Sequence, residues 1–142
     1  MTIQQISVFV ENKPGSLVKV LDVLKQAGIQ IIASTIADTV DAGIYRIICS
    51  EPAKAYLALH NAGFSAMLTD VLALVLDNEV GRAADTLRIL TESGVNVAYL
   101  YSFMLGGKGI LIIRANDADR ARELIMQNNL NFVAEKDLSG WV

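Results

Sequence analysis

Apolar residues along the chain switch between the two-residue period of a strand and the 3.6-residue period of a helix. The run ISVFV predicts a strand, and the segment after it carries apolar residues at helical spacing until Gly28, a residue type that commonly ends helices. Pro52 begins a second helical pattern. The first half is predicted to contain, in order, a strand at 6–10, a helix at 17–27, strands at 29–37 and 44–50, a helix at 52–62 and a strand at 64–68.

The second half of the chain repeats this pattern at an offset of 66 residues, without a gap. Strands are therefore predicted at 71–76, 95–103, 110–115 and 130–134, and helices at 83–93 and 117–128. Residues of the turns and of the core recur together: Asn12 aligns with Asn78, Gly15 with Gly81, Leu24 with Leu90 and Gly28 with Gly94. Two copies of one structural unit are the simplest explanation.

Each copy has the order strand, helix, strand, strand, helix, strand. With right-handed crossovers this order predicts the ferredoxin-like βαββαβ plan, an α+β unit with an antiparallel sheet and both helices on one face. We expect two units in tandem, residues 1–69 and 70–142, packed as one body because the join MLTD is too short for a flexible linker. Strands such as VLALVL are apolar on both faces, so the face without helices should meet another apolar surface. A homodimer is therefore expected.

Composition narrows the class of protein. Of all residues 53% are hydrophobic, yet no apolar run approaches the roughly 18 residues of a membrane span, so no membrane partner is expected. No basic segment followed by a long apolar run opens the chain, which favours a cytoplasmic location. The single cysteine, Cys49, cannot form a disulfide within the chain, and no metal or cofactor is expected. A net charge of −3 with scattered Lys and Arg argues against nucleic acid as a partner.

The repeated polar turn between first strand and first helix is the candidate site. Gly15 and Gly81 stand where each helix begins, and a helix start favours an anion such as an α-carboxylate. Asn12 and Asn78 carry amides that can accept from an α-ammonium group and donate to a carboxylate. The backbone N–H groups expected to face the carboxylate belong to Ser16, Leu17, Arg82 and Ala83. The structural alternative is that the asparagine closes its own turn and Ser16 caps the helix.

The segments VENKPGSLVKVLDVLKQAGIQI and LDNEVGRAADTLRILTESGVNV resemble the opening of the ACT domain, a βαββαβ regulatory module that binds amino acids in many enzymes of amino-acid metabolism. The resemblance covers essentially the whole chain, twice. It implies a non-catalytic sensor or regulatory protein that needs no cofactor and binds a free amino acid where two such modules pair. It also implies an enzyme or regulator of amino-acid metabolism as a partner. A second polar residue is implied at the start of each second strand, Gln30 and Asn96.

The second corner departs from this motif, because Val80 stands where the first has Pro14, and we expect it to be looser. Two other functions remain as alternatives. An acylphosphatase-like hydrolase on the same fold would need an arginine cradle and an asparagine in the first loop, where Lys13 is the only cation. A single-stranded RNA binder would expose aromatic residues from its central strands, and Phe9 and Tyr45 are too few.

Several other side chains are interpreted structurally. Asp38 and Asp41 are interpreted as solvated residues of a hairpin turn. The aromatic residues of the strand 95–103, which share one face, are interpreted as packing against the sheet; the alternative is that they form the wall of a pocket. These aromatic residues are Tyr99, Tyr101 and Phe103.

Overall fold

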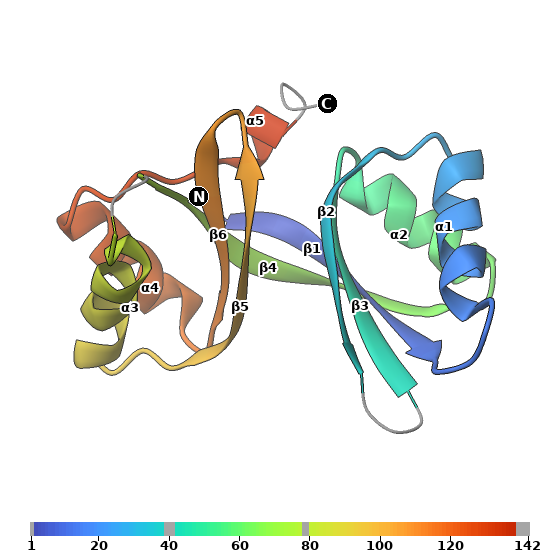
Figure 1. The fold of residues 1–142 in the computed structure, drawn as a ribbon, viewed down its shortest axis with the longest axis horizontal. Coiled ribbons are helices and arrows are strands. Elements are labelled where there is room, and N and C mark those ends of the chain that lie inside the picture. Colours follow the sequence, from blue (N-terminus) through green and yellow to red (C-terminus); the bar gives the residue numbers. More distant parts are fainter. Residues whose placement is uncertain (1, 39–41, 78–79, 139–142) are drawn as a thin grey trace. The chain divides into compact units, whose positions relative to one another are not determined.

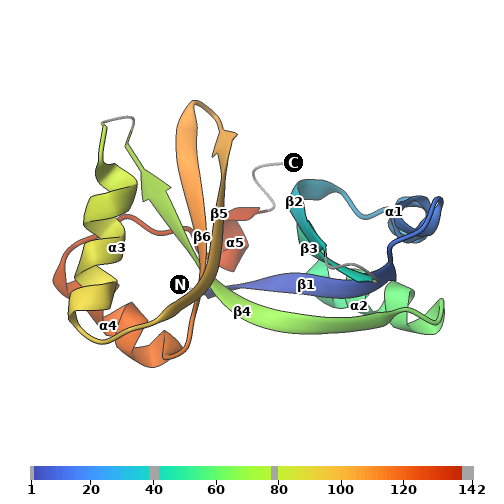
Figure 2. The same cartoon turned by 60° about the horizontal axis from the view of Figure 1, so that its bottom comes forward.

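The structure is a computed structural model that describes residues 2–38, 42–77 and 80–138. It divides into two compact units: one contains residues 4–69 and Leu138, and the other contains residues 70–137 together with Thr2 and Ile3 at the start of the chain. In each unit, two long helices lie on one face of the strands (Figures 1 and 2). The prediction of two α+β units with antiparallel strands and helices on one face is confirmed.

The first unit contains β1 (Thr2–Glu11), α1 (Ser16–Gln26), β2 (Ile31–Asp38), β3 (Ala42–Cys49), α2 (Pro52–Asn61) and the first part of β4 (Ser65–Leu76). Its strand order is β2-β3-β1-β4. β1 pairs with β3 in antiparallel register, with Ile6 opposite Ile47. Because side chains alternate between the faces of a strand, every second residue of β1 points toward the helices. There the strands bury their side chains against Val20 and Leu24 of α1 and Leu59 of α2.

The second unit contains the rest of β4, α3 (Arg82–Glu92), β5 (Val97–Leu105), β6 (Lys108–Ala115) and α4 (Ala118–Gln127). Its strand order is β4-β6-β5. The core repeats that of the first unit: Leu90 of α3 and Ile125 of α4 pack with Leu72 and Leu74 of β4 and Ile113 of β6. A four-residue helix, α5 (Glu135–Leu138), was not anticipated from the sequence. Within the described ranges, no helix has both the length and the apolar character needed to cross a bilayer.

Two predictions about the strands were wrong in detail. The strands predicted at 64–68 and 71–76 are one continuous strand, β4, so the segment MLTD is not a connection. The fourth strand expected at 130–134 is reduced to one antiparallel bridge, in which Phe132 lies opposite Leu74. Backbone hydrogen bonds on either side of this bridge join Val75 N–H to the Asn131 carbonyl (2.9 Å) and Val133 N–H to the Ala73 carbonyl (2.8 Å). The chain then turns into α5, which ends the pairing.

The strand faces away from the helices bury some of their large apolar side chains and expose others, such as Phe9, which is 47% exposed. Ile48 in the first unit and Ile110 and Ile112 in the second are at most 2% exposed. Tyr101 and Phe103 lie opposite Ile112 and Ile110 in the ladder between β5 and β6, and both aromatic side chains are half-buried. This arrangement supports the packing interpretation of the aromatic residues. It also removes these isoleucines from the surface through which a homodimer was expected to form.

Candidate functional site

A hollow of about 240 Å³ opens at the first corner, where β1 ends and α1 begins. The turn between the two elements and the first turn of α1 form one side of it, and the last residues of β2 with the first residues of β3 form the other. Its lining residues are Val10, Glu11, Asn12, Lys13, Pro14, Gly15, Ser16, Leu17, Val18, Ile36, Asp38 and Gly43. Of the predicted residues, Asn12, Gly15, Ser16 and Leu17 therefore come together at one hollow.

Gly15 shapes the start of α1 through its backbone conformation. It is the N-cap residue, with φ 87° and ψ −10° in the left-handed region, and Gly81 holds the same place before α3 with φ 89° and ψ 0°. A β-carbon at either position would meet no atom within 4 Å, so conformation and not crowding requires glycine. Neither helix receives a hydrogen bond from a side-chain cap. No side-chain cap therefore occupies the N–H groups of either first turn.

The structural alternative for the first corner is not supported. Among the described residues, the Asn12 side chain makes no hydrogen bond, so it does not close its own turn. Ser16 is the first helical residue and not the cap, and its N–H donates to the Lys13 carbonyl at 3.3 Å. The N–H of Lys19 donates to the Gly15 carbonyl at 3.2 Å. Leu17 and Val18 therefore carry the first-turn N–H groups that remain at this hollow.

An acid at the end of the first strand belongs to each corner, and sequence reasoning missed both. Lys13 Nζ lies 2.7 Å from Glu11 Oε2, with both side chains largely exposed. The hydrogen bond from Lys13, followed by its charge, lowers the pKa of the Glu11 carboxyl. Arg82 Nε lies 2.8 Å from Asp77 Oδ1 at the second corner. The available signal was the repeat itself, because Glu11 and Asp77 align at the offset of 66 residues.

The hollow at the second corner is larger, about 700 Å³. It is bounded by the end of β4, the first turns of α3, the turn between β5 and β6, and the segment after α4. Its lining residues are Val75, Leu76, Asp77, Arg82, Asp85, Thr86, Ile89, Gly106, Gly107, Lys108, Asn129, Leu130 and Asn131. Of the predicted residues of this corner, Arg82 lines the hollow, Gly81 and Ala83 do not, and Asn78 lies outside the described residues.

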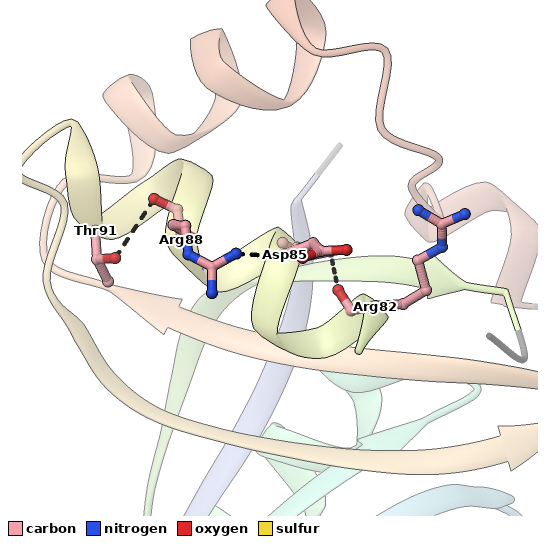
Figure 3. Close-up of polar contacts among 5 residues, drawn as sticks. Arg82, Asp85, Arg88 and Thr91 are labelled. Carbon is pink, nitrogen blue, oxygen red and sulfur yellow. Dashed lines mark hydrogen bonds and ion pairs between the residues drawn. The ribbon is translucent and has the colours of Figure 1, made fainter. Parts of the chain in front are cut away.

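Polar contacts along α3 hold several of these side chains in place (Figure 3). Arg88 donates to the Asp85 carboxylate at 3.3 Å, and the Thr86 hydroxyl donates to the Arg82 carbonyl at 2.9 Å. The Arg82 guanidinium extends away from Asp85 and Arg88 (Figure 3). It is held by Asp77 instead. The two acids of this hollow therefore have different cationic partners.

The residues expected from the second strands, Gln30 and Asn96, lie at the other end of their units. In the antiparallel ladders, Glu11 is opposite Ala42 at the corner, whereas Ile31 is opposite Cys49 at the far end. Gln30 N–H donates to Ser50 Oγ (3.2 Å) and its carbonyl accepts from Ser50 N–H (3.0 Å). Equivalent bonds join Asn96 to Asn116, at 2.9 and 3.0 Å. Gln30 lines a separate hollow together with Gly28 and Ile29, not the corner of its own unit.

Sequence reasoning also missed residues that reach the corners from other elements. Asp38, interpreted as a solvated turn residue, is exposed and lines the first hollow, whereas Asp41 lies outside the described residues. Lys108, Asn129 and Asn131 line the second hollow, and no local motif marks them. In the described part of the chain, no group of three or more His, Cys, Asp or Glu side chains is arranged to hold a metal ion.

Comparison with protein families decides what these paired units are. Residues 1–142 match the family model described as an ACT domain pair. The chain belongs to the ACT domain family. The resemblance seen in its two corner segments is thereby confirmed, and the match places an ACT pair over the full sequence. A search of curated proteins finds no match.

Solved structures agree with this assignment of the ACT pair. Protein BT0572 from Bacteroides thetaiotaomicron is 36% identical, with 98% of this chain and 96% of that chain covered and a TM-score of 0.92. The regulatory subunit of aspartate kinase from Thermus thermophilus, in its ligand-free form, is 19% identical over 87% of this chain and 91% of that chain, with a TM-score of 0.63. Its counterpart from Thermus flavus is also 19% identical, over 87% and 90%, with a TM-score of 0.59. At 19% identity the latter two show a common fold.

Proposed function

We propose that this ACT pair is a non-catalytic regulatory protein that binds a free amino acid at its corners. One observation carries the proposal: both units build a hollow from the same parts. Each has an acid at the end of the first strand, Glu11 or Asp77, and a helix start that no side chain caps. An acid beside a helix start without a side-chain cap offers one partner for an ammonium and another for a carboxylate.

The groups at the first corner match the charged end of an amino acid. The Glu11 carboxylate and the Asn12 amide oxygen would accept from the α-ammonium group. The N–H groups of Leu17 and Val18, with the ammonium of Lys13 nearby, would donate to the α-carboxylate. Hydrogen bonds to charged groups contribute about 1.5–3 kcal/mol each, so three of them with some apolar burial reach the roughly −8 kcal/mol of a micromolar ligand.

A second unit would complete the first corner. Its 240 Å³ falls below the roughly 300–1,000 Å³ usual for small-molecule sites, whereas the 700 Å³ of the second corner falls within that range. Gln30 and Asn96 lie away from the corners of their own units, so each would have to act on a ligand held by another ACT unit. We propose that a homodimer of this chain provides such pairs of units.

A regulatory role is supported by the fold of the neighbours. Two of them are regulatory subunits of aspartate kinase, so proteins of the same fold exist as regulatory subunits of an enzyme. We propose a partner of that kind, an enzyme or regulator of amino-acid metabolism. The hydrolase alternative gains no support. No arginine is among the residues that line the first hollow, and Arg82 at the second is paired with Asp77.

Isothermal titration calorimetry against the twenty amino acids tests the proposal. We expect at least one to bind with micromolar affinity, and the double variant Asn12→Ala, Asn78→Ala to bind it at least tenfold more weakly. Asn61→Ala is the matched control, because it removes an exposed amide at the end of α2, away from the lining of both hollows. The proposal fails if no amino acid binds below millimolar concentration, or if the double variant binds as tightly as the parent.

A further inference from the structure

The two units differ at the residue that follows their second helix. The first unit leaves α2 through Gly63, with φ 89°, and the aligned residue after α4 is Asn129, with φ 51°. Asn129 is the one residue other than glycine with a positive φ among those described. Glycine adopts this left-handed conformation without a steric cost and is the usual choice at the end of a helix. Asparagine is the residue that most often replaces glycine there, so the turn permits Asn129 but does not require its side chain.

The Asn129 side chain does not serve the helix end. The neighbouring Asn128 does so, because its amide donates to the Leu124 carbonyl at 2.8 Å. Asn129 lines the second hollow, and so does Asn131. Neither side-chain amide makes a hydrogen bond to another residue in the described parts of the chain. Two carboxamide groups therefore line this hollow, and their donors and acceptors make no hydrogen bond within the described residues.

The first hollow has no carboxamide at the equivalent positions. The residues that align with Asn129 and Asn131 are Gly63 and Ser65, and neither is among its lining residues. The amides thus distinguish the two corners, which otherwise share an acid and an uncapped helix start.

The charged groups of the second hollow favour a side chain without net charge. Asp77 pairs with Arg82 and Asp85 with Arg88, and the remaining charged lining residue is Lys108. The charged lining residues are two acids and two bases, so their net charge is zero. Both acids are paired, and the lining side chains without a described partner include the two amides and Lys108. A carboxamide both donates and accepts, so another carboxamide satisfies it best.

We propose that the second corner selects an amino acid with a carboxamide side chain, L-glutamine or L-asparagine, and that Asn129 and Asn131 recognise this group. The inference rests on the proposed function, because Asp77 and the start of α3 would hold the charged end of the same ligand. The side chain then reaches across the hollow to the segment after α4. A site built to hydrogen-bond its ligand discriminates strongly against an analogue that lacks the group, because the amides of the site are left unpaired.

Calorimetry with three ligands of similar size tests this selectivity. L-Glutamine should bind the parent at least tenfold more tightly than L-glutamate, which replaces the amide with a charge, and than L-norleucine, which replaces it with an apolar group. The double variant Asn129→Gly, Asn131→Ser carries the residues of the first unit. It should bind L-glutamine about tenfold more weakly and L-norleucine as before. Gly63→Asn, which places an asparagine at the equivalent turn of the first unit, should leave the affinity for L-glutamine unchanged.

Thermal melting separates recognition from a structural role. Asn129→Gly should not lower the melting temperature, since glycine suits the left-handed conformation. A lowered melting temperature with unchanged selectivity would assign Asn129 to the fold and overturn the inference. A parent that prefers L-norleucine or L-glutamate, or variants that keep the preference for L-glutamine, would overturn it as well, while amino-acid binding at the corners would stand. If no amino acid binds the parent, the inference and the proposed function both fail.

Discussion

Truncating one buried leucine in each unit tests whether the two units unfold together, as the short join in the sequence predicts. Leu24 of α1 and Leu90 of α3 align in the repeat, and each is at most 1% exposed in the core of its own unit. Replacement by alanine at such a site costs about 2–5 kcal/mol, because the cavity left behind collapses only partly. The boundary between the units falls inside β4, between Thr69 and Asp70, so unfolding one unit breaks a strand that continues into the other.

The expected shift in melting temperature depends on how much of the chain unfolds with the altered residue. Unfolding entropy near the midpoint is about 2.1 cal/mol/K per residue, which gives about 0.3 kcal/mol/K for the whole chain. A loss of about 3 kcal/mol then lowers one common transition by about 10 °C. If each unit unfolded alone, its entropy would be about half as large, and the transition of the altered unit would fall by about 20 °C.

Differential scanning calorimetry on the parent, Leu24→Ala, Leu90→Ala and the double variant distinguishes these cases. We expect one transition in every sample, lowered by about 10 °C in each single variant and by about 20 °C in the double variant. Leu57→Ala is the control, because Leu57 is 56% exposed on α2 and its truncation should shift the transition by less than about 2 °C. Two transitions in a single variant, with one at the parental temperature, would refute the reasoning.

Three further predictions follow from particular residues. Gly15→Ala forces an alanine into a left-handed N-cap, so it should lower the free energy of unfolding, measured in urea, by about 1–2 kcal/mol and also weaken amino-acid binding. Gly28→Ala, at the other end of α1 where φ is 73°, should lower the free energy of unfolding but leave binding unchanged. NMR should show the Glu11 carboxyl titrating at a lower pH than an unpaired glutamate, with Lys13→Ala raising the midpoint. The pKa of Glu11 is lower in the folded state than in the unfolded state. The small contribution of this pair to stability is therefore present above the unfolded-state pKa and is lost as pH falls through the folded-state pKa. An unchanged midpoint in Lys13→Ala would contradict the assignment. Light scattering should show a dimer. Phe9→Glu, which places a charge on the exposed apolar part of the β1 face away from the helices, should convert it to a monomer, and a parent that is monomeric at micromolar concentration would exclude the dimer.

Much of the candidate site could be predicted from the sequence because its parts are local. Asn12, Gly15, Ser16 and Leu17 are near neighbours in the chain, and a strand followed by a turn and a helix brings them to one hollow whatever the rest of the unit does. Asn129 and Asn131 could not be assigned in this way. They reach the second hollow because the segment after α4 pairs with β4 through the bridge at Phe132, a contact between residues far apart in sequence.

The sequence by itself determined the repeat, the helices and most strands. A helix or strand that buries one face carries apolar residues at its own period, and this period can be recognised within a few residues of the chain. Helix limits were also local: Gly15 and Pro52 mark starts, and both stand at or beside the first residue of a helix. Only the tertiary structure decided the ladder registers, which place Gln30 at the end of the unit opposite to Asn12. The tertiary structure alone decided the sizes of the two hollows. It also decided that the fourth strand predicted for the second unit is only a single bridge at Phe132. These features depend on which distant segments supply hydrogen-bond partners. The period of one segment indicates which of its faces is buried, but it does not indicate which segment pairs with it.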